Sequence, residues 1–474
     1  MSSSDSAGPE SGPTAELLRL TWPAALSFLL GSAYRINDQF WIQGLGESAQ
    51  SATAAVLFVA IMNFSAAILA AGGALSLVAR AVGAKDLGRA HRVARHAIGF
   101  AIALGLGFSL LGPLVTPGII SLLGVSGATA ELARDYLGTL FLTSIPLFLA
   151  PTLDNVFIGR GQTRVPMFLQ LSAIGLNYLL NPLLIYGAEA DAVMAGVPGA
   201  AFAAGVAERF GIGGLGITGA AWATGLSRTI TGLVGLVLMR AMYGTSLRPR
   251  VRMDGALLGS LARIAYPVSL SIALYAGVYW VMLGLVFSEL GDAVRAGFGI
   301  GFQVFDGLAF PLFLGLGVAT STLVGRELGA DRVERADRVV RSARRVAWTL
   351  GATMAALFWI FAVPVAHQFT DEPAVFEHIV LYANVLACSQ LFVAIETLEE
   401  KILLGAGTTR SIPIISGLGN GLRIPLAYVL GLSLGFGPLG VWWAINATTM
   451  LKAFLYWRQV QRGDWRRAVG VEAP

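Results

Sequence analysis

The sequence has little charge for its length. Of its 474 residues, 13% are Asp, Glu, Lys or Arg, whereas an average soluble domain carries about 25%. The single cysteine, Cys388, excludes an internal disulfide framework and a thiolate metal cluster. The four histidines lack metal-ligand spacing, and no Walker A lysine motif is present, which argues against direct coupling to ATP. The composition therefore excludes an ordinary soluble domain.

Apolar residues and glycine are abundant instead. The chain is 55% hydrophobic and contains 58 glycines, and its mean hydropathy is +0.69. Small residues allow membrane helices to approach closely where no hydrophobic effect drives them together. These features predict an integral, multi-pass membrane protein. The net charge of +5 is then explained by arginines that flank the membrane and not by binding to nucleic acid.

The distribution of basic residues predicts the topology. Arg and Lys cluster in every second loop, at 80–95, 160–164, 240–252, 326–345, 410 and 458–467. By the positive-inside rule, this pattern predicts twelve transmembrane helices in an all-α protein of the plasma (inner) membrane, with both termini in the cytoplasm. The predicted units are a disordered tail (1–14), an N-terminal six-helix lobe (15–245), a cytoplasmic linker (246–260), a C-terminal six-helix lobe (261–462) and a cytoplasmic tail (463–474).

The two halves of the chain resemble each other. LRLTWP, which ends at Pro23, matches LARIAYP, which ends at Pro267, and GRGQTR from Gly159 matches GAGTTR from Gly405. Two repeats in the same orientation predict two lobes related by a pseudo-two-fold axis along the membrane normal, with a cavity between them. Residues 187–214 break the register and are expected to form an extra external loop.

One acidic residue lies inside the first apolar run. Asp38 is the centre of YRINDQFWIQGLG, and an ionisable group at membrane depth is costly enough to suggest a transport function. Arg35 lies three residues earlier and is a candidate ion-pair partner for Asp38. The alternative is that the two form a neutral pair that only fixes helix packing.

Several motifs together carry a family resemblance over nearly the whole chain, from about Leu17 to about Trp457. They are the helix 1 segment around Asp38, ARAVGA, GRGQTRVPM, NYLLNPLLIYG, GITGAAWATG and PLFLGLGVATSTLVGRELGA. In order, spacing and duplication they resemble the multidrug and toxic compound extrusion (MATE) transporters. The resemblance implies a twelve-helix, two-lobed antiporter that expels cationic or amphipathic compounds by alternating access, driven by a proton or sodium gradient.

The resemblance also implies roles for residues of the N-terminal lobe. Asp38 matches the helix 1 aspartate that similar transporters use for cation coupling, and Pro23 matches a proline at which that helix bends. Thr224 of helix 6 matches a threonine that lines the same cavity.

Helices 4 and 5 supply further candidates for this cation-coupling site. Asn177 and Asn181 are one helical turn apart and so face the same side. Some relatives have an aspartate at the second position, so the asparagine here leaves Asp38 as the main titratable group. Asp154 of helix 4 is a further candidate for this cation-coupling site.

The sequence is compatible with either a proton or a sodium ion as the coupling ion. A buried carboxyl favours its protonated form, which would suit proton loading at Asp38. The oxygens of Asp38, Asn177, Asn181 and Thr224 are also of the hard type that a sodium ion prefers. No other cofactor and no resident metal ion is expected.

The C-terminal lobe has a different set of acids. Asp306 lies in helix 8, and Glu396 and Glu400 lie one turn apart in helix 10. One interpretation is a second cation site or part of a drug pocket. The other is a charge-paired closure of the lobe, with Arg423 of helix 11 as a partner.

Two other functions fit the sequence less well. A flippase for a lipid-linked saccharide or lipid resembles this architecture, although flippases usually have more helices and a more basic cavity. A membrane enzyme acting on lipids would need a catalytic constellation, and only the acids of helix 10 offer one. The expected partners are therefore small cationic or amphipathic molecules and membrane lipids, for a chain that functions as a monomer.

Overall fold

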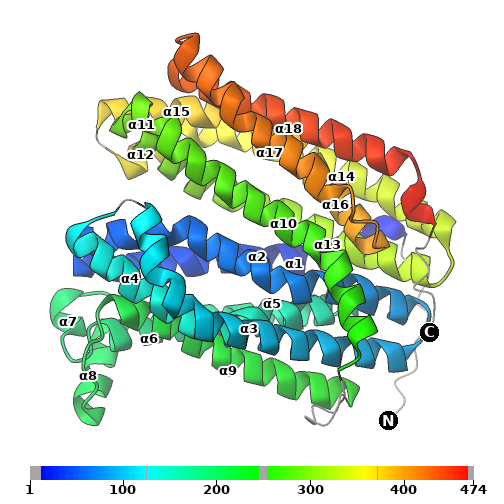
Figure 1. Ribbon diagram of the computed structural model, residues 1–474, viewed down its shortest axis with the longest axis horizontal. Coiled ribbons are helices and arrows are strands. Elements are labelled where there is room, and N and C mark those ends of the chain that lie inside the picture. Colours follow the sequence, from blue (N-terminus) through cyan, green and yellow to red (C-terminus); the bar gives the residue numbers. More distant parts are fainter. Residues whose placement is uncertain (1–11, 124, 245–252, 371, 468–474) are drawn as a thin grey trace.

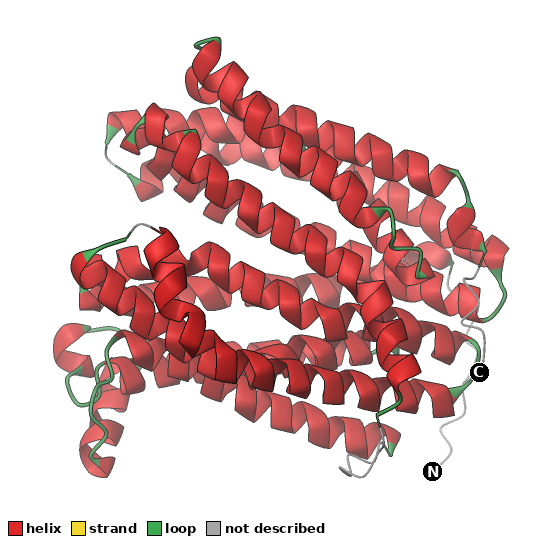
Figure 2. Ribbon diagram, in the orientation of Figure 1, coloured by secondary structure: helices red, strands yellow, loops and turns green. Residues whose placement is uncertain are grey.

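The structure is a computed structural model that describes residues 12–123, 125–244, 253–370 and 372–467. Most of the two predicted tails, 1–14 and 463–474, and part of the predicted linker, 246–260, lie outside these residues. Within the described chain the regular structure is helical, with one isolated β-bridge between Gly187 and Gly213 (Figure 2).

The first half contains six membrane-crossing units. They are α1 (Pro13–Ile42), α2 (Glu47–Gly83), α3 (Leu87–Leu123), the pair α4 (Gly127–Leu142) and α5 (Ser144–Gly159), α6 (Arg164–Ile185) and α9 (Ile217–Tyr243). The first two are joined by the short η1 (Gln43–Leu45).

The second half repeats this arrangement. Its units are α10 (Gly255–Leu285), α12 (Asp292–Gly301) running through η2 (Phe302–Asp306) into α13 (Gly307–Gly329), α14 (Val333–Phe369), the pair α15 (Pro373–Ala387) and α16 (Gln390–Ala406), α17 (Ile412–Ala427) with η3 (Tyr428–Ser433), and α18 (Gly437–Gln461). The short α11 (Phe287–Leu290) and η4 (Asp464–Arg466) lie between or after them.

Length and hydropathy support a membrane location. Among the described residues, seven helices are long and apolar enough to cross a membrane, and nine spans result if each bent pair is counted as one. The remaining units are α1, α17 and α18, whose counterparts in the other half are α10, α6 and α9. The prediction of an all-α, two-lobed protein with twelve membrane-crossing units is confirmed.

A bend recurs at the same point of each half. The pair α4 and α5 bends by 54° at Thr143, and the pair α15 and α16 bends by 56° beside Ser389. Thr143 and Ser389 have the same separation in the chain as Gly159 and Gly405, which the repeated motif pairs. The duplication seen in the sequence therefore extends to the shape of the helices.

The two halves meet along four helices near the centre of the molecule. Figure 1 shows α1 to α9 on one side and α10 to α18 on the other, with α1 packed on α13 and α2 packed on α10. A Cβ atom at Gly315 would lie 2.5 Å from the backbone of Ala25, and one at Gly73 would lie 2.4 Å from the carbonyl oxygen of Leu261. Glycine is thus required for these close helix crossings.

Ion pairs join the halves at the end where the predicted cytoplasmic loops lie. Glu16 in the first turn of α1 pairs with Arg326 at the end of α13, and its other oxygen lies 3.6 Å from Arg335 of α14. Beside them Glu327 is buried and pairs with Arg332 at 2.8 Å. The lobes are therefore tied together at this end.

Two segment boundaries differ from the sequence prediction. Residues 187–214 are a folded insertion and not a simple loop, because they contain α7 (Ala190–Val193) and α8 (Ala200–Phe210). Helix α10 begins inside the predicted linker, since the Asp254 carboxylate accepts a hydrogen bond from the Ala256 amide at 2.9 Å and caps the helix.

Candidate functional site

Asp38 is the centre of a buried polar cluster. Its Oδ1 accepts a hydrogen bond from Asn181 Nδ2 at 2.9 Å, and its Oδ2 accepts one from Thr224 Oγ1 at 3.0 Å. Asn177 Oδ1 accepts from Asn181 Nδ2 at 3.3 Å and from Asn37 Nδ2 at 2.6 Å. The side chain of Asp38 is only 8% exposed. The structure therefore brings together four of the predicted site residues.

The cluster forms because three helices present one polar face each. Asn177 and Asn181 are four residues apart on α6, which packs against both α1 and α9. Two amide atoms of the cluster, Asn177 Nδ2 and Asn181 Oδ1, are buried without a hydrogen-bond partner. The cluster thus has an unused donor and an unused acceptor, so its hydrogen bonds can rearrange when Asp38 changes charge.

The cation beside this cluster is Arg228 and not Arg35. Arg35 is exposed and makes no ion pair among the described residues, because successive residues on a helix are turned by about 100° and Arg35 leaves the face that Tyr34 and Asp38 share. The guanidinium of Arg228 lies over the Tyr34 ring, 4.6 Å from its centroid. The predicted Arg35–Asp38 ion pair is wrong.

Neither Tyr34 nor Arg228 was predicted from the sequence to be part of this polar cluster. The Tyr34 hydroxyl hydrogen-bonds Ser227 and donates to the Thr224 carbonyl oxygen at 3.4 Å. Arg228 Nη1 donates to Gln170 Oε1 at 2.6 Å. A signal was available, because an arginine in the apolar run 217–243 is an ionisable residue at membrane depth.

Asp154 lies outside the Asp38 cluster. Its Oδ2 accepts a hydrogen bond from Gln170 Nε2 at 2.8 Å, so the Gln170 amide bridges it to Arg228. Asp154, Gln170 and Arg228 line a cavity of about 10 Å³, which is roughly the space for one water molecule. The structure therefore places Asp154 in a second polar cluster, joined to the first through Arg228 and Tyr34.

Pro23 lies within α1, which continues as a helix from residue 13 to residue 42. The proline ring is buried and cannot donate a hydrogen bond to the carbonyl oxygen of Arg19. The helix therefore has a weakened turn one third of the way along its length, between the Glu16 ion pairs and Asp38.

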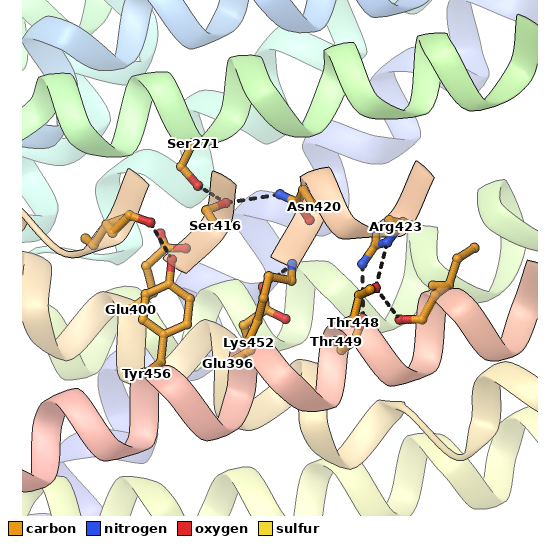
Figure 3. A network of polar contacts seen from close by, with 12 residues as sticks. Ser271, Glu396, Glu400, Ser416, Asn420, Arg423, Thr448, Thr449, Lys452 and Tyr456 are labelled. Carbon is orange, nitrogen blue, oxygen red and sulfur yellow. Dashed lines mark hydrogen bonds and ion pairs between the residues drawn. The ribbon is translucent and has the colours of Figure 1, made fainter. Parts of the chain in front are cut away.

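The acids of α16, the predicted helix 10, are paired with cations in the C-terminal lobe. Lys452 Nζ lies 2.6 Å from Glu396 (Figure 3). Lys401 Nζ lies 2.6 Å from Glu400. The neighbouring Glu399 binds Arg344 through two hydrogen bonds, at 2.6 and 2.9 Å. This arrangement favours the charge-paired closure.

Arg423 is not a partner of these acids. Its guanidinium donates to the hydroxyls of Thr448 at 3.1 Å and Thr449 at 3.2 Å (Figure 3). It also donates to the Tyr279 hydroxyl at 3.0 Å. Arg423 is nearly completely buried, so three hydroxyls replace its hydration. The prediction that Arg423 forms a charge pair with the acids of α16 is wrong, because the Arg423 side chain contacts α18 and α10 instead.

Asp306 and Glu396 have separate partners. Asp306 lies at the end of the π-helical segment η2 and accepts a hydrogen bond from the Tyr382 hydroxyl. Glu396 pairs with Lys452. A joint cation site of these two acids is therefore not supported by their contacts, although π-helical turns often occur at functional positions.

The fold and the buried acids define the class of protein as a two-lobed, multi-pass membrane protein with an ionisable cluster in each lobe. The family model MatE matches residues 23–183 and 267–429, one block in each half. The chain therefore belongs to the MATE family of multidrug and toxic compound extrusion transporters.

Similar proteins cover almost the whole chain. A probable multidrug resistance protein NorM of Thermotoga maritima is 25% identical over 96% of this chain and 94% of its own length. The multidrug export protein MepA of Staphylococcus haemolyticus is 24% identical over 93% and 91%.

Solved structures agree with the fold. A crystal structure of MATE in complex with MaL6 has a TM-score of 0.84 at 21% identity, covering 96% of this chain and 98% of that chain. A MOP superfamily transporter from Pyrococcus furiosus, described as having a binding pocket of reverse polarity, has a TM-score of 0.83 at 21% identity over 96% and 97%. At this identity the likeness shows the fold alone.

Proposed function

We propose that this protein is a secondary antiporter that exports cationic or amphipathic small molecules in exchange for protons. The observation that carries the proposal is the buried Asp38 carboxyl, whose two oxygens accept hydrogen bonds from two other helices. The names of the relatives, which describe multidrug resistance and export, give the substrate class.

The geometry suggests how protonation moves a helix. As a carboxylate, Asp38 holds α1 to α6 and α9 through charge-assisted hydrogen bonds. A proton removes the charge and occupies one oxygen, which weakens both bonds. Helix α1 then bends at Pro23, where a main-chain hydrogen bond is missing. A cationic substrate and a proton compete for the same negative charge, so their binding is mutually exclusive.

A proton suits this site better than a sodium ion. The groups that meet Asp38 present hydrogen atoms to it, the Asn181 amide nitrogen and the Thr224 hydroxyl, whereas a sodium ion would need oxygen atoms turned toward it.

The ion pairs of Glu16 with Arg326 and Arg335 join the lobes at the end where the basic loops lie, which supports a state closed toward the cytoplasm. In this arrangement the protein is a monomer in the plasma (inner) membrane with both termini in the cytoplasm, and it releases substrate on the other side.

Efflux of a fluorescent organic cation from proteoliposomes tests the function. A proton gradient and a sodium gradient are imposed separately on the purified full chain. We expect concentrative export with the proton gradient alone. Export with the sodium gradient alone would show that the coupling ion is sodium and not a proton. The absence of export under both gradients would contradict the proposed antiporter function.

Thr224→Val should reduce this export about tenfold. The variant removes one hydrogen bond to a charged carboxylate, which contributes about 1.5 to 3 kcal/mol, while the volume stays nearly constant. The matched control is Thr229→Val on the same helix, whose hydroxyl bonds only the Gly225 carbonyl oxygen. Rates measured at saturating substrate decide the matter: equal rates for the two variants would contradict a role for the Thr224 hydroxyl.

A further inference from the structure

Arg228 is an intramembrane cation without a direct carboxylate partner. It lies on α9, one turn after Thr224, and is partly buried. Its contacts are the face of Tyr34 and the side-chain oxygen of Gln170. None of the ion pairs within the described chain includes it, so its charge is balanced only through bridging groups.

Two carboxyls lie on either side of this cation. Asp154 is reached through Gln170, whose amide donates to the carboxylate at 2.8 Å and accepts from Arg228 at 2.6 Å. Asp38 is reached through Tyr34, which is on the same face of α1. The lobe interior therefore contains two acids and one cation.

Neutral groups surround the three charges on the neighbouring helices. Tyr34 lies on α1 and Tyr136 on α4, which packs against α9, and a tyrosine ordinarily titrates near pH 10. Helix α6 contributes amides, namely Gln170, Asn177 and Asn181. Among the described side chains of α2 and α3, the charged and histidine residues lie toward the basic loop that joins the two helices: Arg80, Arg89, His91, Arg92, Arg95 and His96.

We propose that Arg228 is the shared counter-cation of Asp38 and Asp154, and that it positions a single transported proton on this pair of carboxyls. One cation balances one carboxylate, so the second carboxyl is favoured in its neutral, protonated form. The proton is taken up on Asp38 or Asp154 from one side of the membrane and leaves the same pair toward the other. This inference rests on the proposed proton-coupled function.

Opposite shifts of the pH profile test the inference. Efflux of the fluorescent cation is measured in proteoliposomes while the absolute pH is stepped and the pH difference is held constant. Arg228→Gln removes the cation, so both acids retain protons to higher pH and the optimum should move up by about one unit. Asp154→Asn removes the competing negative charge, so the optimum should move down. Arg228→Lys keeps the charge and should restore most of the original profile.

The control is Arg240→Gln, an exposed arginine near the end of the same helix, whose profile should match that of the unaltered protein. A profile of Arg228→Gln that does not move, or that moves in the same direction as that of Asp154→Asn, overturns the inference. If Arg228→Gln does not reach the membrane in folded form, Asp154→Asn decides, and an unmoved optimum overturns the inference. Asp38→Asn separates the two claims, because coupled export that survives this change contradicts the proposed function itself.

Discussion

Asp38→Asn is expected to abolish concentrative export under a proton gradient, with a reduction of about a hundredfold or more. Asparagine has the shape of aspartate but cannot take up a transported proton, and it loses the charge in two hydrogen bonds, each of which contributes about 1.5 to 3 kcal/mol. Asn is nearly isosteric with Asp and therefore fits the buried site, so the variant should still fold. The measurement is uphill efflux from proteoliposomes, together with the thermal unfolding midpoint of the purified protein.

The matched control is Asp135→Asn, an exposed carboxyl on α4. It should export like the unaltered protein, because it lies outside the buried cluster. Uphill export that persists in Asp38→Asn would contradict the proposed function, in which the Asp38 carboxyl is the coupling group. A loss of export in both variants would indicate a general effect of lost negative charge and not a coupling site.

Lys452→Met should destabilise the C-terminal lobe by about 3 to 5 kcal/mol. The lysine is buried and pairs with Glu396 at 2.6 Å, so its removal leaves an uncompensated carboxylate in the helix bundle. The double variant Lys452→Met with Glu396→Leu should recover much of the stability, because apolar residues often replace a buried ion pair at no net cost. Thermal unfolding in detergent, followed by gel filtration, measures both.

The pair Arg466–Asp337 offers the control in the same lobe. It is partly exposed, with 43% and 24% of the side-chain surfaces accessible, and Arg466→Gln should change stability by less than about 1 kcal/mol. A Lys452→Met variant as stable as Arg466→Gln would contradict a stabilising role of the buried Lys452–Glu396 pair.

Both expected results depend on whether a buried acid is paired directly with a cation or held by neutral donors. In the C-terminal lobe the acids of α16 have direct partners, Lys452, Lys401 and Arg344. In the N-terminal lobe, Asp38 and Asp154 are held by neutral donors, and their shared cation lies one side chain away. A carboxyl held by neutral groups can change its protonation state at less cost than one in a direct ion pair. This difference is the reason to place coupling at Asp38 and not at the acids of α16.

The sequence by itself determined the membrane class, the twelve spans and the duplication, since hydropathy, basic loops and repeated motifs are properties of single segments. It also determined that Asn177 and Asn181 share a face, because four residues make about one helical turn. Only the tertiary structure decided which cation serves which acid: Arg228 in place of Arg35, and Lys452 in place of Arg423. The physical reason is that lipid and protein interior are both apolar, so the pattern of a membrane helix does not reveal which face meets a neighbouring helix.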